Sequence, residues 1–235
     1  MHRYLTKLLL PLCLLLLPRA SAQEKKIPQV LFLGDSIHQT IVQAAALDLS
    51  GIASIHYPPG GSVNDSDAAL AKIDSLLGET QWDIIYFNFG IGELFYKDPA
   101  TREIRIMSKE SGGVRVSTPA QYEKQLDSLV QRLKTTNAKL IWGNTTPMIT
   151  VYGYSSHRGI RFDANSELEY NTIAARVMAK HKVPVVDLHA HVMAQFKSDD
   201  KHPPYTQYIG EMIKRGHPLH APLVQALKAV ANEIR

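Results

Sequence analysis

The hydrophobic positions of this chain fall into five short continuous runs, separated by stretches in which apolar residues recur at helical spacing. The runs are rich in β-branched and aromatic residues, which is typical of strands buried on both faces of a parallel sheet. We expect strands at residues 30–33, 52–57, 83–89, 139–143 and 183–188.

Amphipathic stretches lie between or after these runs. They predict helices at residues 41–49, 68–77, 122–133, 167–179 and 222–234, the last of which begins with Pro222, a residue suited to a first helical turn. Strand and helix alternate, so the pattern predicts a three-layer α/β/α sandwich around a parallel sheet with right-handed crossovers.

Two polar stretches, residues 96–118 and 148–165, break this alternation and are expected to be loops. Both follow strands, which places them at the carboxyl edge of the sheet, where open α/β folds hold their sites. The second loop carries aromatic and basic side chains that could clamp a sugar or pack within the loop: Tyr152, Tyr154, His157 and Arg158.

Length and composition suit one globular domain. The chain has 235 residues, of which 45% are hydrophobic and 20% charged, which leaves little room for a second domain. The single cysteine, Cys13, excludes an intramolecular disulfide and any zinc site built on several cysteines.

Residues 1–22 have the pattern of a secretory signal peptide. A basic start precedes an apolar run at residues 8–17, and small residues follow at 20–22, where cleavage is expected. The run is too short to span a bilayer comfortably. We therefore expect a mature domain at residues 23–235 that is secreted or periplasmic and not held in the membrane.

The net charge changes once this segment is removed. Residues 1–22 contain three of the 26 basic residues and none of the 22 acidic ones, so the formal charge falls from +4 to +1. No basic stripe with interleaved aromatic residues is visible. The sequence gives no reason to expect a nucleic-acid partner.

The strongest candidate for chemistry lies at the end of the first predicted strand, in Gly34-Asp35-Ser36-Ile37. A serine at a strand-to-helix junction has its hydroxyl at the sheet edge, and the free amides of the helix N-terminus favour an oxyanion. The alternative is that Asp35 or Ser36 only caps the helix.

Gly34-Asp35-Ser36-Ile37 resembles the nucleophile block of the SGNH (GDSL-type) hydrolases. Pro58-Pro59-Gly60-Gly61 resembles their second, glycine-containing block, and residues 87–94 resemble the third block, usually written G-x-N-D. The third block is most similar to an exported branch in which it reads Phe-Asn-x-Gly-Leu-His-Asp-Leu. Further stretches similar to that branch are residues 121–123, 138–142, 145–147, 170–171 and 186–188.

The resemblance implies a flavodoxin-like, five-stranded parallel sheet and a serine esterase that uses no metal or organic cofactor. Ser36 would attack an ester carbonyl, and a histidine near the C-terminus, oriented by an aspartate three residues earlier, would take its proton. The oxyanion would be held by the amides of Ser36 and Gly61 and by a side chain of the third block.

The third block departs from the family pattern at two positions. Gly92 stands where the family has Asn, or His in the most similar branch, and Glu93 replaces the usual Asp. Loss of one oxyanion donor costs roughly 3 kcal/mol of transition-state stabilisation, unless Asn88, Asn64 or a backbone amide replaces it. These changes are compatible with a weak, an altered or an inactive enzyme.

The base has more than one candidate. Asp199 and His202 match the family's D-x-x-H-P spacing and are the favoured acid and base. His217 and His220 lie just ahead of the final predicted helix, where the family's histidine normally sits, but neither has an aspartate three residues before it.

His189 and His191 follow Asp187 at the end of the fifth predicted strand, where all three would share one face. No further ligand cluster lies nearby at metal spacing, so we expect a structural or substrate-facing role and no metal site.

These observations predict an exported serine esterase that cleaves small acyl esters through an acyl-Ser36 intermediate, with small-molecule or glycan esters as substrates. The alternative is a catalytically impaired SGNH-fold module that binds a glycan or a protein. Acyl transfer to a sugar would use the same nucleophile and differ only in the acceptor.

Overall fold

The structure is a computed structural model that describes residues 26–58, 61, 63–101, 107–147, 162–163, 165–197, 214 and 216–234, the side chains of residues 196 and 197 excepted. The predicted signal peptide, most of the loop at residues 148–165 and the pair Asp199 and His202 lie outside these residues.

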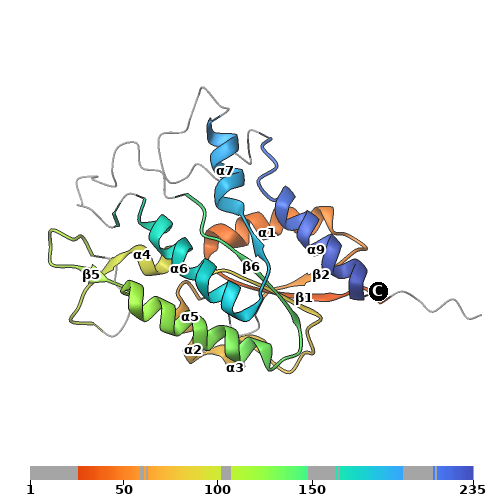
Figure 1. The fold of residues 1–235 in the computed structure, drawn as a ribbon, viewed down its shortest axis with the longest axis horizontal. Coiled ribbons are helices and arrows are strands. Elements are labelled where there is room, and N and C mark those ends of the chain that lie inside the picture. The colour runs from red at the N-terminus through yellow and green to blue at the C-terminus, as the bar shows by residue number, and fades with distance from the viewer. Residues whose placement is uncertain are drawn as a thin grey trace, which may run out of the picture.

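Five parallel strands form the central sheet, as predicted (Figure 1). They lie in the order β2-β1-β3-β6-β7, and their bounds are β1 Gln29–Leu33, β2 Ser54–His56, β3 Ile84–Phe87, β6 Lys139–Gly143 and β7 Val185–Val186. The chain passes from β1 to β2 on one side and then to β3 on the other. The topological switch point, where open α/β folds bind ligands, therefore lies at the carboxyl ends of β1 and β3.

Helices cover both faces of the sheet and complete the three-layer α/β/α sandwich (Figure 1). One face packs against α1 Ser36–Asp48, α7 Leu188–Lys197 and α9 Ala221–Ile234. The opposite face packs against α2 Ser66–Ala71, α3 Ile73–Leu77, α5 Pro119–Lys134 and α6 Ser166–His181.

The two hydrophobic cores follow from the alternation of side chains along each strand. In β1, Leu31 and Leu33 face the α5–α6 side, whereas Val30 and Phe32 face the α1–α9 side. All four side chains are buried, which explains why this strand is a continuous apolar run rather than an alternating one.

The predicted loop at residues 96–118 contains an antiparallel hairpin, β4 Tyr96–Lys97 paired with β5 Val114–Arg115. The expectation of a plain loop was therefore wrong in this part. Each strand has two residues and includes a basic side chain, so neither produced an apolar alternation that the sequence could reveal.

The predicted fifth strand was too long. β7 ends at Val186, and α7 begins at Leu188, so His189 and His191 lie in a helix and not on a strand as expected. Asp187 Oδ1 accepts a hydrogen bond from the amide of Ala190 at 2.9 Å, which explains why the chain turns into a helix at this point.

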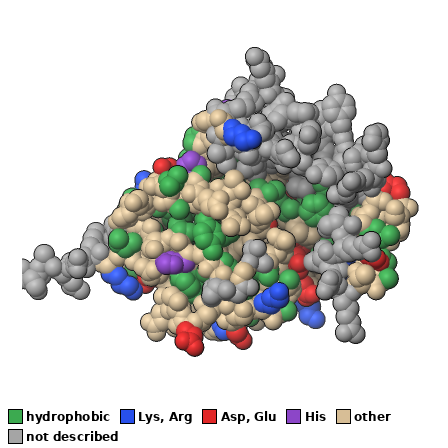
Figure 2. Space-filling model, turned by 180° about the vertical axis from the view of Figure 1, so that it is seen from behind, with side chains coloured by type: hydrophobic (Ala, Val, Ile, Leu, Met, Phe, Trp, Pro, Cys, Tyr) green, Lys and Arg blue, Asp and Glu red, His purple; other side chains and the backbone are tan. Residues whose placement is uncertain are grey.

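The surface opposite to the view of Figure 1 has acidic and basic side chains interspersed around its rim (Figure 2). Across the described part of the chain, every helix is too short or too polar to cross a membrane.

Candidate active site

The junction of β1 and α1 places Ser36 at the switch point. Asp35 is the N-cap of α1, and its Oδ1 accepts hydrogen bonds from the amides of Ile37 at 2.9 Å and His38 at 2.8 Å. Asp35 is buried, whereas Ser36, the first helical residue, is exposed. The capping alternative therefore holds for Asp35 and leaves the Ser36 side chain at the surface.

The amides at the start of α1 are partly satisfied by this cap. Asp35 occupies the amides of Ile37 and His38, but neither the amide nor the hydroxyl of Ser36 forms a hydrogen bond to another described residue. Because a helix N-terminus favours negative charge, the Ser36 amide is suited to hold an oxyanion.

A buried polar cluster lies beneath Ser36. The His38 ring, fully buried, has its Nδ1 3.4 Å from Asp35 Oδ1 and its centroid 6.4 Å from that of Tyr86. Burial, and then the charge of Asp35, raise the pKa of the Tyr86 hydroxyl. Among the described residues neither His38 nitrogen nor Tyr86 Oη has a hydrogen-bond partner.

In the second block, Gly61 adopts a left-handed conformation with φ of 84°, and its amide donates to Pro58 O at 3.1 Å. That amide is thus bonded within its own turn, which does not favour the predicted oxyanion contact from Gly61. Gly60 lies outside the described residues.

Gly92 of the third block lies in α4 Ile91–Leu94, against the backbone that follows the second block. A Cβ at this position would collide with the carbonyl oxygen of Asn64. Gly92 is therefore required by the close approach of Asn64, and the side chain that the family carries there has no space.

Asn88 does not replace the missing donor. Its side chain is fully buried, and Nδ2 donates to Gly143 O at 2.8 Å, which ties the end of β3 to the end of β6. The predicted oxyanion role of Asn88 is thus not supported, because its donor is used inside the fold.

Glu93 joins the third block to α2. Its carboxyl is fully buried, and Oε1 accepts a hydrogen bond from the amide of Ser66 at 2.6 Å. Burial raises the pKa of Glu93 to about 8, although the Ser66 amide opposes this shift. Glu93 is therefore mostly protonated near neutral pH.

The structure separates His220 from Ser36. His220 Nε2 lies 2.8 Å from Asp48 Oδ2, and Asp48 is the last residue of α1. Asp48 follows Ser36 by twelve residues, or about 18 Å along the helix at 1.5 Å per residue. In this position His220 cannot take a proton from Ser36.

His217 is held at the far end of α7. Its Nδ1 lies 3.3 Å from Gln195 Oε1, and Gln195 follows the first residue of α7 by seven residues, about 10 Å along the helix. In Figure 1, α7 extends away from the sheet. The contact with Gln195 therefore holds His217 beyond the carboxyl edge rather than at it.

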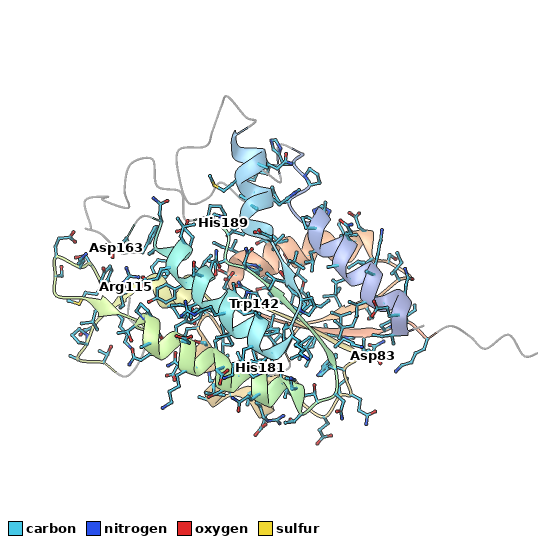
Figure 3. All side chains as sticks on the ribbon, in the orientation of Figure 1. Asp83, Arg115, Trp142, Asp163, His181 and His189 are labelled. Atoms are coloured by element: carbon cyan, nitrogen blue, oxygen red, sulfur yellow. The ribbon has the colours of Figure 1, made fainter. Side chains whose placement is uncertain are left out.

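His189 lies at the carboxyl edge itself, where α6 and α7 begin (Figure 3). Its Nε2 is 3.6 Å from Oε1 of Glu167, a residue of the first turn of α6 that is 2% exposed. Glu167 and His189 are 22 positions apart and share no motif, so no sequence signal points to Glu167. Among the described residues, no three potential metal ligands come together.

A second polar cluster connects the hairpin to the end of the loop at residues 148–165 (Figure 3). Asp163 accepts hydrogen bonds from Tyr96 Oη at 2.6 Å, Arg115 Nη2 at 2.7 Å and Lys109 Nζ at 3.1 Å. These contacts, that of Tyr96 most strongly, lower the pKa of Asp163. The candidate sugar-binding residues Tyr152, Tyr154, His157 and Arg158 lie outside the described residues.

A parallel sheet with an exposed serine at the β1–α1 junction defines an α/β fold with a candidate site at its switch point. No protein-family model matches the chain, and no curated protein matches it. Solved structures resemble it. The acetyl xylan esterase AlAXEase has a TM-score of 0.59 at 14% identity, with 84% of this chain and 98% of that chain covered.

A lipase/acylhydrolase from Enterococcus faecalis has a TM-score of 0.56 at 18% identity, covering 86% of this chain and 96% of its own. A GDSL-like lipase from Bacteroides thetaiotaomicron has a TM-score of 0.54 at 14% identity, covering 86% and 88%. The chain therefore has the fold of the SGNH (GDSL-type) hydrolases, which confirms the expected fold class.

Proposed function

We propose that the protein is an exported serine esterase that cleaves small acyl esters through an acyl-Ser36 intermediate. The observation that supports this proposal most is the position of Ser36. Ser36 is the first residue of α1 at the carboxyl edge of the sheet, and it is exposed. Asp35 accepts hydrogen bonds from the next two amides of the helix, whereas the Ser36 amide has no partner among the described residues.

The reaction would run in two halves. Ser36 Oγ attacks the ester carbonyl carbon while a histidine takes the hydroxyl proton, and the oxyanion faces the amide of Ser36. The C–O bond to the leaving alcohol then breaks, and the histidine gives its proton to that alcohol. Water attacks the acyl-Ser36 ester in the same way, which releases the acid and returns a proton to Ser36.

The substrate class is proposed from the neighbours and from the sequence. An acetyl xylan esterase among the structural neighbours supports acetyl groups on carbohydrate as the first substrates to test. Acyl transfer to a sugar hydroxyl would pass through the same acyl-serine. Product analysis separates the two reactions, because hydrolysis releases the free acid and transfer yields a new ester.

The test compares residues 23–235 with the variants Ser36→Ala and Ser50→Ala in the hydrolysis of p-nitrophenyl acetate. Ser50 is exposed just after the opposite end of α1 and serves as the matched control. We expect Ser36→Ala to lower kcat by at least about a thousandfold and Ser50→Ala to leave it unchanged. Equal activity of wild type and Ser36→Ala would remove Ser36 from catalysis.

One observation favours the alternative of an impaired module that binds a glycan or a protein. The carbonyl oxygen of Asn64, an acceptor, occupies the space in which the family's third block presents a donor. If wild type shows no turnover while acetylated xylo-oligosaccharides bind it in calorimetry, the binding module replaces the esterase.

Export is proposed from residues 1–22 alone. Expression of the full chain in a Gram-negative host should yield protein in the periplasm or the medium whose N-terminus is residue 23, as measured by mass spectrometry of the intact protein. An uncleaved product in the cytoplasm would contradict export.

A further inference from the structure

Glu167 and His189 form an acid–imidazole pair. His189 was not among the three histidines that the sequence predicted as candidates for the base, His202, His217 and His220. Glu167 is 2% exposed, and neither its Oε2 nor His189 Nε2 forms a hydrogen bond within the described part of the chain. Buried carboxyl oxygens usually have partners, so the unpartnered Oε2 is unusual, and the other oxygen, Oε1, lies 3.6 Å from His189 Nε2.

Hydrogen bonds fix this pair above the end of β6. The amide of His189 donates to Asn144 Oδ1 at 2.9 Å. On the other side, Asn171, one turn after Glu167 in α6, bonds the amide and the carbonyl of Thr145, both at 2.8 Å. Glu167 and His189 are thus anchored to the two residues that directly follow β6.

Close backbone contacts link this position to Ser36. A Cβ on Gly90, at the end of β3, would collide with the Thr145 side chain. On the far side of β3, a Cβ on Gly34 would lie 3.1 Å from Asn88 O. The end of β3 therefore packs closely against the end of β1 on one side and against the end of β6 on the other. The ends of β1 and β6 are two strand spacings apart, roughly 10 Å.

The other described histidines of the C-terminal region are held elsewhere. His220 is bonded at the far end of α1, and His217 is bonded near the far end of α7. His191 Nε2 lies 3.1 Å from Pro218 O, next to His217. Of these four, His189 is the one that lies at the carboxyl edge.

We infer that His189 is the general base of the Ser36 site and that Glu167 is the carboxylate that orients it. This inference rests on the proposed esterase function. Nε2 is buried against Glu167, so Nδ1 takes the proton as Ser36 Oγ attacks the carbonyl carbon. Glu167 then stabilises the imidazolium, and Nδ1 returns the proton to the leaving alcohol oxygen. The 3.6 Å gap is of the kind that tightens when substrate binds.

The chain offers a matched control for each residue. His191 lies two residues after His189 in α7, and Glu169 lies two residues after Glu167 in the first turn of α6, exposed to solvent. We expect His189→Gly to lower kcat for p-nitrophenyl acetate about a hundredfold or more. Glu167→Gln should lower it at least about tenfold, whereas His191→Ala, Glu169→Gln, His217→Ala and His220→Ala should stay within twofold of wild type.

Chemical rescue separates a catalytic from a merely structural role of His189. Imidazole added to the buffer should restore part of the activity of His189→Gly and none of that of Ser36→Ala. A loss that imidazole does not restore, an equal loss in His189→Gly and His191→Ala, or full activity in His189→Gly would overturn the inference.

The result also distinguishes the inference from the function on which it rests. Loss of activity in Ser36→Ala with full activity in His189→Gly leaves the esterase in place and removes His189 as its base. A decrease confined to His217→Ala would assign the base to that residue instead. If Ser36→Ala itself keeps full activity, the proposed function fails together with the assignment of a base to Ser36.

Discussion

The buried carboxyl of Glu93 shows how one residue couples the site to pH. The pKa of Glu93 is raised from an ordinary value of 4.5 to about 8, because burial disfavours the charged form. Its hydrogen bond from the Ser66 amide at 2.6 Å holds the chain after the second block against the third block. The carboxyl therefore joins two segments of the fold, and its burial favours the protonated form.

Replacing Glu93 by glutamine should change the pH dependence of stability. Between pH 4.5 and about 8 the folded wild type binds one proton more than the unfolded chain, so its free energy of unfolding falls as pH rises, by up to ~1.4 kcal/mol per pH unit. The stabilisation is complete below pH 4.5 and is lost by about pH 8. Glu93→Gln lacks this dependence, so its free energy of unfolding should rise relative to that of wild type at each step from pH 5 to 8.

Urea denaturation at four pH values measures this difference, with Glu169→Gln, an exposed carboxyl on α6, as the control. The control should follow the wild-type profile. Parallel profiles for wild type and Glu93→Gln would show that Glu93 is ionised in the folded protein.

Residues of the candidate site could be predicted from the sequence where they belong to one local motif. Asp35 and Ser36 were predicted because a strand, a cap and a helix follow one another within a few residues. Glu167 and His189 come together only through the order β3-β6-β7 and the packing of α6 and α7 beside it. No spacing in the chain encodes that contact, so the structure was needed to find it.

At the scale of elements, α4 packs closely against the chain after the second block because Gly92 has no side chain. The Asn64 carbonyl lies where a side chain would begin. Gly92→Asn restores the residue of the family's third block, yet we expect it to destabilise the protein by about 1–3 kcal/mol, because backbone atoms must move. It should not raise kcat. Thermal unfolding and p-nitrophenyl acetate hydrolysis measure both effects.

Gly112→Ala is the control for Gly92→Asn. Gly112 has φ of 88° and open space around its Cβ position, so this substitution adds backbone strain without a collision and should cost ~1 kcal/mol. A Gly92→Asn variant as stable as wild type and more active would show that the third block accepts the family's donor.

The bounds of the elements were predicted most accurately where apolar residues are buried on both faces of a strand. The strand at residues 139–143 was predicted with its observed bounds, because apolar residues fill it on both faces. Helix α1 begins five residues earlier than predicted, at Ser36, since its first turn contains the polar residues of the nucleophile block. The polar residues of this first turn therefore left no apolar pattern from which the start of the helix could be predicted.

For the whole molecule, the sheet separates two hydrophobic cores, one on each of its faces. Ile173 of α6 belongs to one core and Ile41 of α1 to the other, and both are buried. Ile→Val at either site should cost about 0.5–1.5 kcal/mol of unfolding free energy. Since the two side chains share no contact surface across the sheet, the double variant should show the sum within about 0.5 kcal/mol.

A contacting pair provides the comparison. Phe87 and Trp142 are register partners in β3 and β6, with ring centroids 5.1 Å apart in an edge-to-face arrangement. Phe87→Leu and Trp142→Phe should therefore deviate from additivity by about 0.5–1.5 kcal/mol. Urea denaturation of the single and double variants measures both cycles. The Ile41 and Ile173 substitutions could instead deviate from additivity as much as this pair. The helix layers on the two faces of the sheet would then be energetically coupled, and a change in packing at α1 would affect α6, where Glu167 lies.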